Sequence, residues 1–343
     1  MQERDHQPDK GHAAEGLPAE ALTAAVLREL VEEEYLPADI ALRPLRGSRG
    51  RIVLSVLLRF VALLAGTLGI VVALLFVAAL FVGREQVRSM ETVYPALALT
   101  VGSLVAYLLV ARFLEGRKFL VELAPRRPSA LLIGVAGGGV AFLLCYGLIG
   151  LFGGYQVSYV GMNWSAFGMS VLYVGLSAGV LEEILFRGGL FRLSEDIFGT
   201  WGAILISAAA FGLGHAFNPN SSAWSTFAII VEVGVLFGGL YALTRSLWLV
   251  IGFHSTWNVS LAVFGIAVSG NEPARILFST RAIGSAWLTG GEFGMEASIV
   301  TVTLLGLLGL VVVLLILARD QTLSPLWRRG PQLTQTGPDE LAV

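Results

Sequence analysis

Charged residues are scarce in this sequence of 343 residues. They make up 14% of it, whereas hydrophobic residues make up 55% and the mean hydropathy is +0.74. Soluble domains carry about 25% charged residues, so this composition excludes an ordinary soluble protein. Several apolar windows reach the roughly 20 residues that a membrane-spanning helix needs, and they are continuously apolar, unlike barrel strands. We therefore predict an all-α fold, a polytopic bundle of membrane helices.

The sequence also has only one cysteine and little net charge, and it does not begin like a secretory leader. The single cysteine, Cys145, excludes an internal disulfide and is interpreted as a small buried hydrophobe. Residues 1–16 are polar, so no signal peptide is expected. With a net charge of −2 the sequence lacks the basic surface of a nucleic-acid-binding protein, and no nucleic-acid partner is expected.

Eight membrane-spanning helices are predicted, with ends defined only to within a few residues. They cover residues 60–83, 93–111, 129–151, 166–186, 200–217, 226–243, 247–268 and 297–318. If the N-terminus is cytoplasmic, 19 of the 23 Lys and Arg residues lie on the cytoplasmic side, as the positive-inside rule requires. We therefore expect both termini in the cytoplasm and the protein in the bilayer of the plasma membrane.

The chain is expected to have three parts. Residues 1–50 form a cytoplasmic N-terminal tail, residues 51–318 the eight-helix membrane domain, and residues 319–343 a cytoplasmic C-terminal tail. The segment "LPAEALTAAVLRELVEEEYLPADI" in the first tail predicts one amphipathic helix, which begins near Pro18 and ends at Pro37. We interpret it as a docking or regulatory helix.

Two glycine pairs have the spacing that lets membrane helices approach closely. They are Gly175–Gly179 and Gly234–Gly238. We predict that these glycines serve packing and take no part in catalysis.

A few polar residues of the predicted spans lie too far from the helix ends to reach the interface. Ionisable groups at such depth are unfavourable by about 2.5–3.5 kcal/mol each and indicate function. The residues are Glu182, Glu183 and Arg187 in span four, His215 in span five, Glu232 in span six, and His254 and Asn258 in span seven. Because Glu232 shares no spacing with the others, we expect it to serve packing or to line a cavity.

Helical spacing indicates which of these side chains share a face. Glu183 and Arg187 are four residues apart, with the acid before the base, and are expected to pair. Glu182 points about 100° away around the helix and needs a partner from another helix. His254 and Asn258 again share a face. By itself, the Glu183–Arg187 pair fits a structural clamp as well as a catalytic role.

The predicted helix ends also give the depth of each residue. At about 1.5 Å per residue, Glu182 and His254 lie about 13–17 Å from the cytoplasmic ends of their spans. His215 lies about 24 Å away by the same count, so span five would have to begin after residue 200 or be tilted. We expect the chemistry to take place near the cytoplasmic side.

Two histidines, a carboxylate and an amide around a water-accessible space fit a hydrolytic reaction. Glu182 with one histidine can orient and deprotonate water. A second histidine with Asn258 can donate hydrogen bonds to a developing oxyanion. The zinc motif HExxH is absent, but a zinc site made by Glu182, His215 and His254 stays open as an alternative.

Three segments resemble the motifs of a known family. "EEILFR" at residues 182–187 resembles an EExxxR motif, "FGLGH" at 211–215 an FxxxH motif, and "HSTWN" at 254–258 an HxxxN motif. These are the motifs of the CPBP intramembrane proteases, which include CAAX proteases and bacteriocin-processing enzymes, and the chain is similar to the type II CAAX prenyl endopeptidase. The resemblance covers about residues 120–270. It implies an eight-helix membrane endopeptidase that cleaves a peptide or a membrane protein.

The resemblance also implies a role for each motif residue: water activation, oxyanion stabilisation and support of the site. These roles fall to Glu182 and His215, to His254 and Asn258, and to Glu183 and Arg187, respectively. Members of the family have been argued to act with and without a metal, so zinc remains an open cofactor.

Two other functions could use the same residues. A transporter or proton-relay protein would use the buried carboxylates, and inverted repeats with interrupted helices would favour it, but the sequence contains no clear pair of them. A non-catalytic relative could act as an immunity-type membrane partner. No feature of the sequence indicates the substrate or the oligomeric state.

Overall fold

The computed structural model describes residues 48–82, 93–117, 120–124, 128–319 and 322–328. The amphipathic helix predicted in the N-terminal tail lies outside these residues, as does most of the C-terminal tail.

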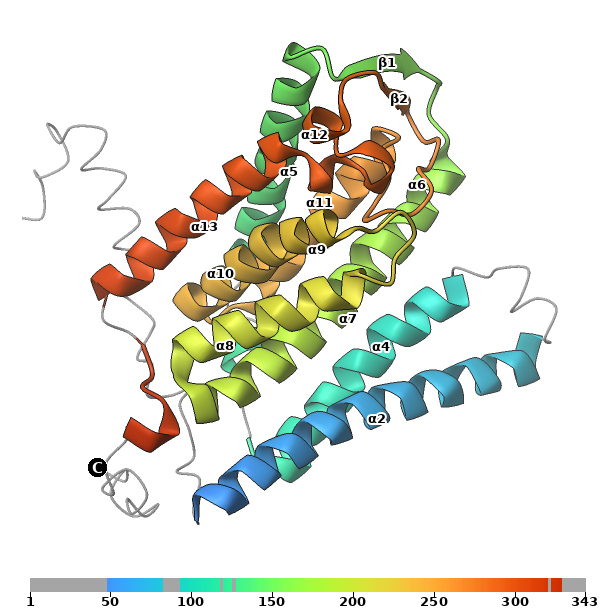
Figure 1. The fold of residues 1–343 in the computed structure, drawn as a ribbon. Helices are drawn as coiled ribbons and strands as arrows, with labels where there is room; N and C mark the ends of the chain where they lie inside the picture. The colour runs from blue at the N-terminus through green and yellow to red at the C-terminus, as the bar shows by residue number, and fades with distance from the viewer. Residues whose placement is uncertain (1–47, 83–92, 118–119, 125–127, 320–321, 329–343) are drawn as a thin grey trace, which may run out of the picture. The chain divides into compact units, whose positions relative to one another are not determined.

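Most of the described chain is helical, and its helices lie alongside one another (Figure 1). The prediction of an all-α fold is confirmed. The α-helices are α2 (Arg49–Val82), α4 (Val93–Leu109), α5 (Pro128–Leu151), α6 (Trp164–Ser170), α7 (Ala178–Glu183), α8 (Arg192–His215), α9 (Ala223–Ile229), α10 (Leu236–Thr244), α11 (Leu247–Val263), α12 (Ala286–Thr289) and α13 (Ile299–Arg319). Turns of π-helix continue several of them, namely η2 (Val110–Leu114), η4 (Val171–Ser177), η5 (Ile184–Phe191) and η6 (Ile230–Val235). Short 3-10 turns are η3 (Val121–Leu123), η7 (Gly291–Phe293), η8 (Met295–Ala297) and η9 (Leu326–Arg328).

Within the described residues, six helical stretches are long and apolar enough to cross a membrane. They are Arg49–Val82, Val93–Leu114, Ser129–Leu151, Trp164–His215, Ala223–Thr244 and Ile299–Arg319. The chain is therefore an integral membrane protein with a polytopic helical bundle. Helix α11 is also apolar but has only 17 residues.

The stretch Trp164–His215 does not run straight, because it turns back at Gly199. This residue has φ 71° and ψ 177°, a left-handed conformation that glycine adopts without strain. A Cβ atom at Gly199 would also overlap the backbone carbonyl of Leu323. The Ser207 hydroxyl donates to the carbonyl of Phe186 (3.3 Å), and α8 packs along η5. The residues after Gly199 therefore run back beside those before it.

The predicted end of span four at residue 186 is wrong, because the helix continues to Phe198. The two basic residues that follow residue 186, Arg187 and Arg192, are part of the helix, and each pairs with a carboxylate. Arg187 pairs with Glu183 (2.9 Å) and Arg192 with Glu115 (2.5 Å). A paired charge can stay inside a bundle, so these residues do not mark the end of the span.

This longer helix also corrects the predicted depths. Glu182 lies 17 residues before Gly199 and His215 lies 16 residues after it. At about 1.5 Å per residue, both are roughly 25 Å from the turn and therefore level with each other. Span five therefore does not have to begin after residue 200 or be tilted to bring His215 to the level of Glu182.

The end of the bundle near Gly199 is held together by ion pairs. In the connection between α4 and α5, Arg117 pairs with Glu122 (2.5 Å), and Tyr107 also donates to Glu122. Burial by itself favours the neutral form of Glu122, but the Arg117 guanidinium more than offsets this and lowers the pKa of the carboxyl. Arg192 joins the same connection to α8 through Glu115.

Two further contacts bring other connections to this end. Arg245, between α10 and α11, makes a two-pronged ion pair with Glu195 of α8 (2.5 and 2.7 Å). After α13, Leu323 and Thr200 exchange two hydrogen bonds, with Leu323 O accepting from the Thr200 amide and Leu323 N donating to the Thr200 hydroxyl. The connections after α4, before α11 and after α13 thus meet at the Gly199 turn.

The other end of the bundle holds a small sheet that the sequence did not predict (Figure 1). Strands β1 (Tyr155–Tyr159) and β2 (Phe278–Ala282) pair antiparallel, with Tyr155 opposite Ala282. The sheet joins the connection after α5 to the long connection between α11 and α13.

Glycines allow the central helices to pack backbone against backbone. A Cβ atom at Gly175 or Gly179 would overlap side chains of α11, and one at Gly234 would lie 2.7 Å from the Cα of Ala208 on α8. The packing role predicted for these three glycines is confirmed, whereas at Gly238 a Cβ would make only ordinary contacts. The closest approach joins α5 and α11.

We expect Gly134→Ala on α5 to destabilise the protein by about 1–3 kcal/mol, because its methyl group would overlap the backbone of Leu249 on α11. Gly147→Ala on the same helix is the control, since nothing lies within 4 Å of the added carbon. Thermal unfolding in detergent measures both. Equal melting temperatures for the two variants would contradict the packing assignment.

Candidate active site

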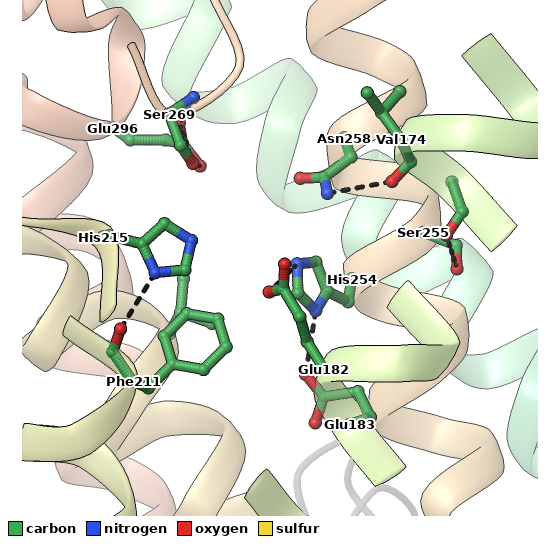
Figure 2. Close-up of polar contacts among 12 residues, drawn as sticks. Val174, Glu182, Glu183, Phe211, His215, His254, Ser255, Asn258, Ser269 and Glu296 are labelled. Atoms are coloured by element: carbon green, nitrogen blue, oxygen red, sulfur yellow. Dashed lines mark hydrogen bonds and ion pairs between the residues drawn. The ribbon is translucent and has the colours of Figure 1, made fainter. Parts of the chain in front are cut away.

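Apart from Glu232, the polar residues predicted at membrane depth come from three helical segments that face one another (Figure 2). Glu182 and Glu183 are the last two residues of α7, between the π-helical turns η4 and η5. His215 is the last residue of α8, and His254 and Asn258 lie on α11. Such π-helical turns inside α-helices are frequent at functional sites.

Glu183 is the centre of the buried part of the site. Its Oε1 accepts a hydrogen bond from Arg187 (2.9 Å), as the i,i+4 spacing predicted, and lies 2.8 Å from Nδ1 of His254. Glu183 and Arg187 have no exposed surface, and His254 is 5% exposed. One carboxylate oxygen therefore joins α7 and η5 to α11.

Arg187 extends this connection to a third helix. Its second terminal nitrogen donates to the carbonyl of Val233 in η6 (2.6 Å). The guanidinium also lies over the rings of Phe211 and Phe237, 4.8 and 5.4 Å from their centroids. Aromatic faces attract such a cation, and so the buried charge has a carboxylate, a carbonyl and two rings around it.

Glu182 is the more accessible of the two glutamates. Its side chain is 26% exposed, and its Oε2 lies 3.7 Å from Nε2 of His254. The partner that the sequence suggested was His215, which faces Glu182 from the other side of the same space (Figure 2). Glu182 is thus paired with His254, and His254 lies between two glutamates.

His215 is held by its own helix. Its Nδ1 lies 2.9 Å from the carbonyl of Phe211, and its ring stacks on the Phe211 ring with centroids 4.6 Å apart. A carbonyl oxygen only accepts, so Nδ1 carries the proton, and in the neutral ring Nε2 is the acceptor. The ring is partly exposed, and this leaves Nε2 able to accept a proton from water.

Asn258 and its neighbour Ser255 attach α11 to η4. The Asn258 amide donates to the carbonyl of Val174 (3.0 Å), and the Ser255 hydroxyl donates to the carbonyl of Gly175 (2.9 Å). An amide nitrogen carries two N–H groups, so one bond to Val174 uses half of its donor capacity.

The structure places one further carboxylate beside the site, which the sequence analysis missed. Glu296, in η8, is 2% exposed and accepts hydrogen bonds from the Ser269 amide (2.6 Å) and hydroxyl (3.0 and 3.2 Å). Burial raises its pKa, while the Ser269 bonds and the charges of His215 and His254 act in the opposite direction. It lies in a connection between helices, where neither helical spacing nor span depth could mark it.

Glu232 is not part of this group. It is completely buried in η6, and neither carboxylate oxygen has a hydrogen-bond partner among the described residues. A packing or cavity-lining role, as predicted, stays our interpretation of this interior position.

Among the described residues, no three histidine, cysteine, aspartate or glutamate side chains lie close enough together to hold a metal ion. Both nitrogens of His254 already face glutamates, and Nδ1 of His215 faces a carbonyl. Glu182, His215 and His254 thus do not form a three-ligand group here, and we assign no step of the reaction to a metal.

A comparison with protein families finds one match. Residues 163–260 match the family model described as type II CAAX prenyl endopeptidase Rce1-like. The matched region runs from the start of α6 into α11 and includes all six of the motif residues above. No curated protein and no solved structure matches the chain.

We expect Arg187→Ala to destabilise the protein by about 3–5 kcal/mol, because it leaves the carboxylate of Glu183 buried without its cation. The exposed Arg112 provides the control, and Arg112→Ala should have little effect. The measurement is the fraction of monodisperse protein after heating in detergent. A loss in Arg187→Ala no larger than that in Arg112→Ala would contradict this account.

Proposed function

We propose that the chain cleaves a peptide bond with water held between Glu182 and His215. The match of residues 163–260 to the type II CAAX prenyl endopeptidase Rce1-like family supports this proposal, because the family implies an intramembrane endopeptidase. The observation that carries the proposal is the position of these two groups. They come from neighbouring helices, lie level with each other and are both partly exposed, in a site whose other charged groups are buried.

In the proposed reaction, water loses a proton to the Glu182 carboxylate or to Nε2 of His215 while its oxygen attacks the peptide carbonyl. The carbonyl oxygen becomes an oxyanion. When the carbon–nitrogen bond breaks, the same group returns the proton to the leaving amine, so that an acid and an amine are the products. General acid–base catalysis of this kind contributes about 10²–10⁴-fold to a rate.

We propose that His254 and Asn258 stabilise this oxyanion. These residues are one helical turn apart on α11 and face the same space. Asn258 has a second amide N–H to donate, and His254 donates from Nε2 when both ring nitrogens carry a proton. Glu183 supports this role because its bond to Nδ1 of His254 orients the ring, and Arg187 in turn holds Glu183. Donors fixed in place before the reaction are the ones that stabilise a developing charge most effectively.

We also propose that the protein lies in the plasma membrane and crosses it eight times. Both termini are then in the cytoplasm. The break at Gly199 divides one of the six long stretches into two, and α11 adds another apolar helix. Residues 1–50 and 319–343 are then cytoplasmic tails around a membrane domain at residues 51–318. The substrate is a protein or peptide.

The test of the water-activating pair uses Glu182→Gln, which keeps the shape of the side chain. We expect kcat to fall by at least about 100-fold with no change in the melting temperature, because the base is lost and the residue is partly exposed. Membrane peptide profiles of wild-type and variant cells identify both activity and substrate. Unchanged cleavage would refute the mechanism, and proton flux in proteoliposomes would instead favour a transporter.

The oxyanion assignment predicts that Asn258→Leu lowers kcat by about 10²–10³-fold. Ser255→Ala is a matched control, since each variant removes one hydrogen bond between α11 and η4. The control should keep most of its kcat. If both variants lose activity equally, the effect comes from helix packing and Asn258 has no role in catalysis.

A further inference from the structure

The two ends of the bundle differ in charge. The basic residues Arg117, Arg192 and Arg245 all lie at the Gly199 end, where each pairs with a glutamate. The connections at the other end of the described chain carry only Arg275 and Arg281. By the positive-inside rule, the Gly199 end is cytoplasmic and the end with the β1–β2 sheet is not.

Part of the candidate site lies next to the non-cytoplasmic end. Glu182 and His215 are roughly 25 Å from the Gly199 turn along their helices, whereas His254 is seven residues, about 10 Å, from the start of α11. His215 is the last residue of α8, and the chain leaves the helix directly after it. The His215 side of the site is therefore next to the connections of the non-cytoplasmic end.

The cytoplasmic side of the site is closed by side chains that exclude water. Ile184 and Arg187, one and four residues beyond Glu183, have no exposed surface, and Phe211 and Phe237 are only 1–2% exposed. Glu182 and His215, on the side of the site away from the Gly199 turn, are partly exposed. Water that reaches these residues thus does not come along the helices from the Gly199 turn.

The non-cytoplasmic side is covered by a polar cap, formed by residues 216–222 and 269–297. Asn218 and Asn220 donate to the carbonyls of Ser269 and Gly270 (3.0 and 3.1 Å), which joins the two parts of the cap. The cap contains a pocket of about 370 Å³ whose lining includes Asn220, Ser222, Trp224, Trp287, Glu292 and Phe293. Two of its lining residues are close in sequence to the site: Asn220 is five residues after His215, and Ala297 directly follows Glu296.

From these positions we propose that the site receives its substrate and water from the non-cytoplasmic side, through the polar cap. The substrate class is then a peptide segment exposed on that side of the membrane, such as the outer part of a membrane protein, and not a cytoplasmic C-terminal tail. This proposal rests on the proposed function. It replaces the expectation of cleavage near the cytoplasmic side.

The test measures from which side an aqueous reagent reaches the site. In the full-length protein with Cys145→Ala, either His215→Cys or Glu182→Cys supplies the only thiol. A membrane-impermeant, positively charged methanethiosulfonate is added to right-side-out or to inverted membrane vesicles. We expect both cysteines to react in right-side-out vesicles and to be spared in inverted ones. Reaction from the cytoplasmic side alone, or from neither side, would overturn the proposal.

Two control positions report the orientation of the chain. Ala223→Cys is exposed at the start of α9 beside the cap, and Ser324→Cys is exposed near the Gly199 turn. The first should react only in right-side-out vesicles and the second only in inverted ones, and the reverse pattern would refute the orientation. Labelling requires no turnover, so its outcome is independent of the Glu182→Gln measurement. Peptides that differ between wild type and Glu182→Gln should come from non-cytoplasmic segments.

Discussion

The bridge made by Glu183 is the interaction on which the site depends. One carboxylate oxygen binds both Arg187 and His254, and Arg187 continues to a carbonyl of η6. Separately, each of these charges would be strongly unfavourable inside a bilayer. Together they form a buried group of opposite charges that fixes three helices relative to one another. The orientation of His254, and therefore of any donor it offers to a substrate, follows from this bridge.

A second constraint, the turn at Gly199, decides how deep the site lies. The left-handed conformation at this residue lets one long helical stretch double back, and the ion pairs of Arg192 and Arg245 hold the returning chain in place. Two residues on opposite sides of the turn, Glu182 and His215, come to the same level because nearly equal numbers of residues separate them from it. The depth of the reaction is thus a consequence of helix length and not of the motifs themselves.

Short-range spacing predicted the local half of the site correctly. The pairing of Glu183 with Arg187 depends only on the 3.6-residue period of one helix, and the close-packing glycines of span four follow from the same period. The contact between Glu182 and His254 was not predicted, because it joins residues 72 positions apart on different helices. Glu296 was missed for a related reason, since it reaches the site from an irregular connection.

The amino-acid sequence by itself determined that this is a helical membrane protein, which motif residues lie on which helices, and which of them share a face. These properties depend on apolar run length and helical period, and both are local. Only the tertiary structure decided where span four ends, at which level of the bundle Glu182 and His215 meet, and which carboxylates surround each histidine. Those depend on ion pairs between distant segments and on one backbone conformation at Gly199, whose effect on the path of the chain cannot be read from neighbouring residues.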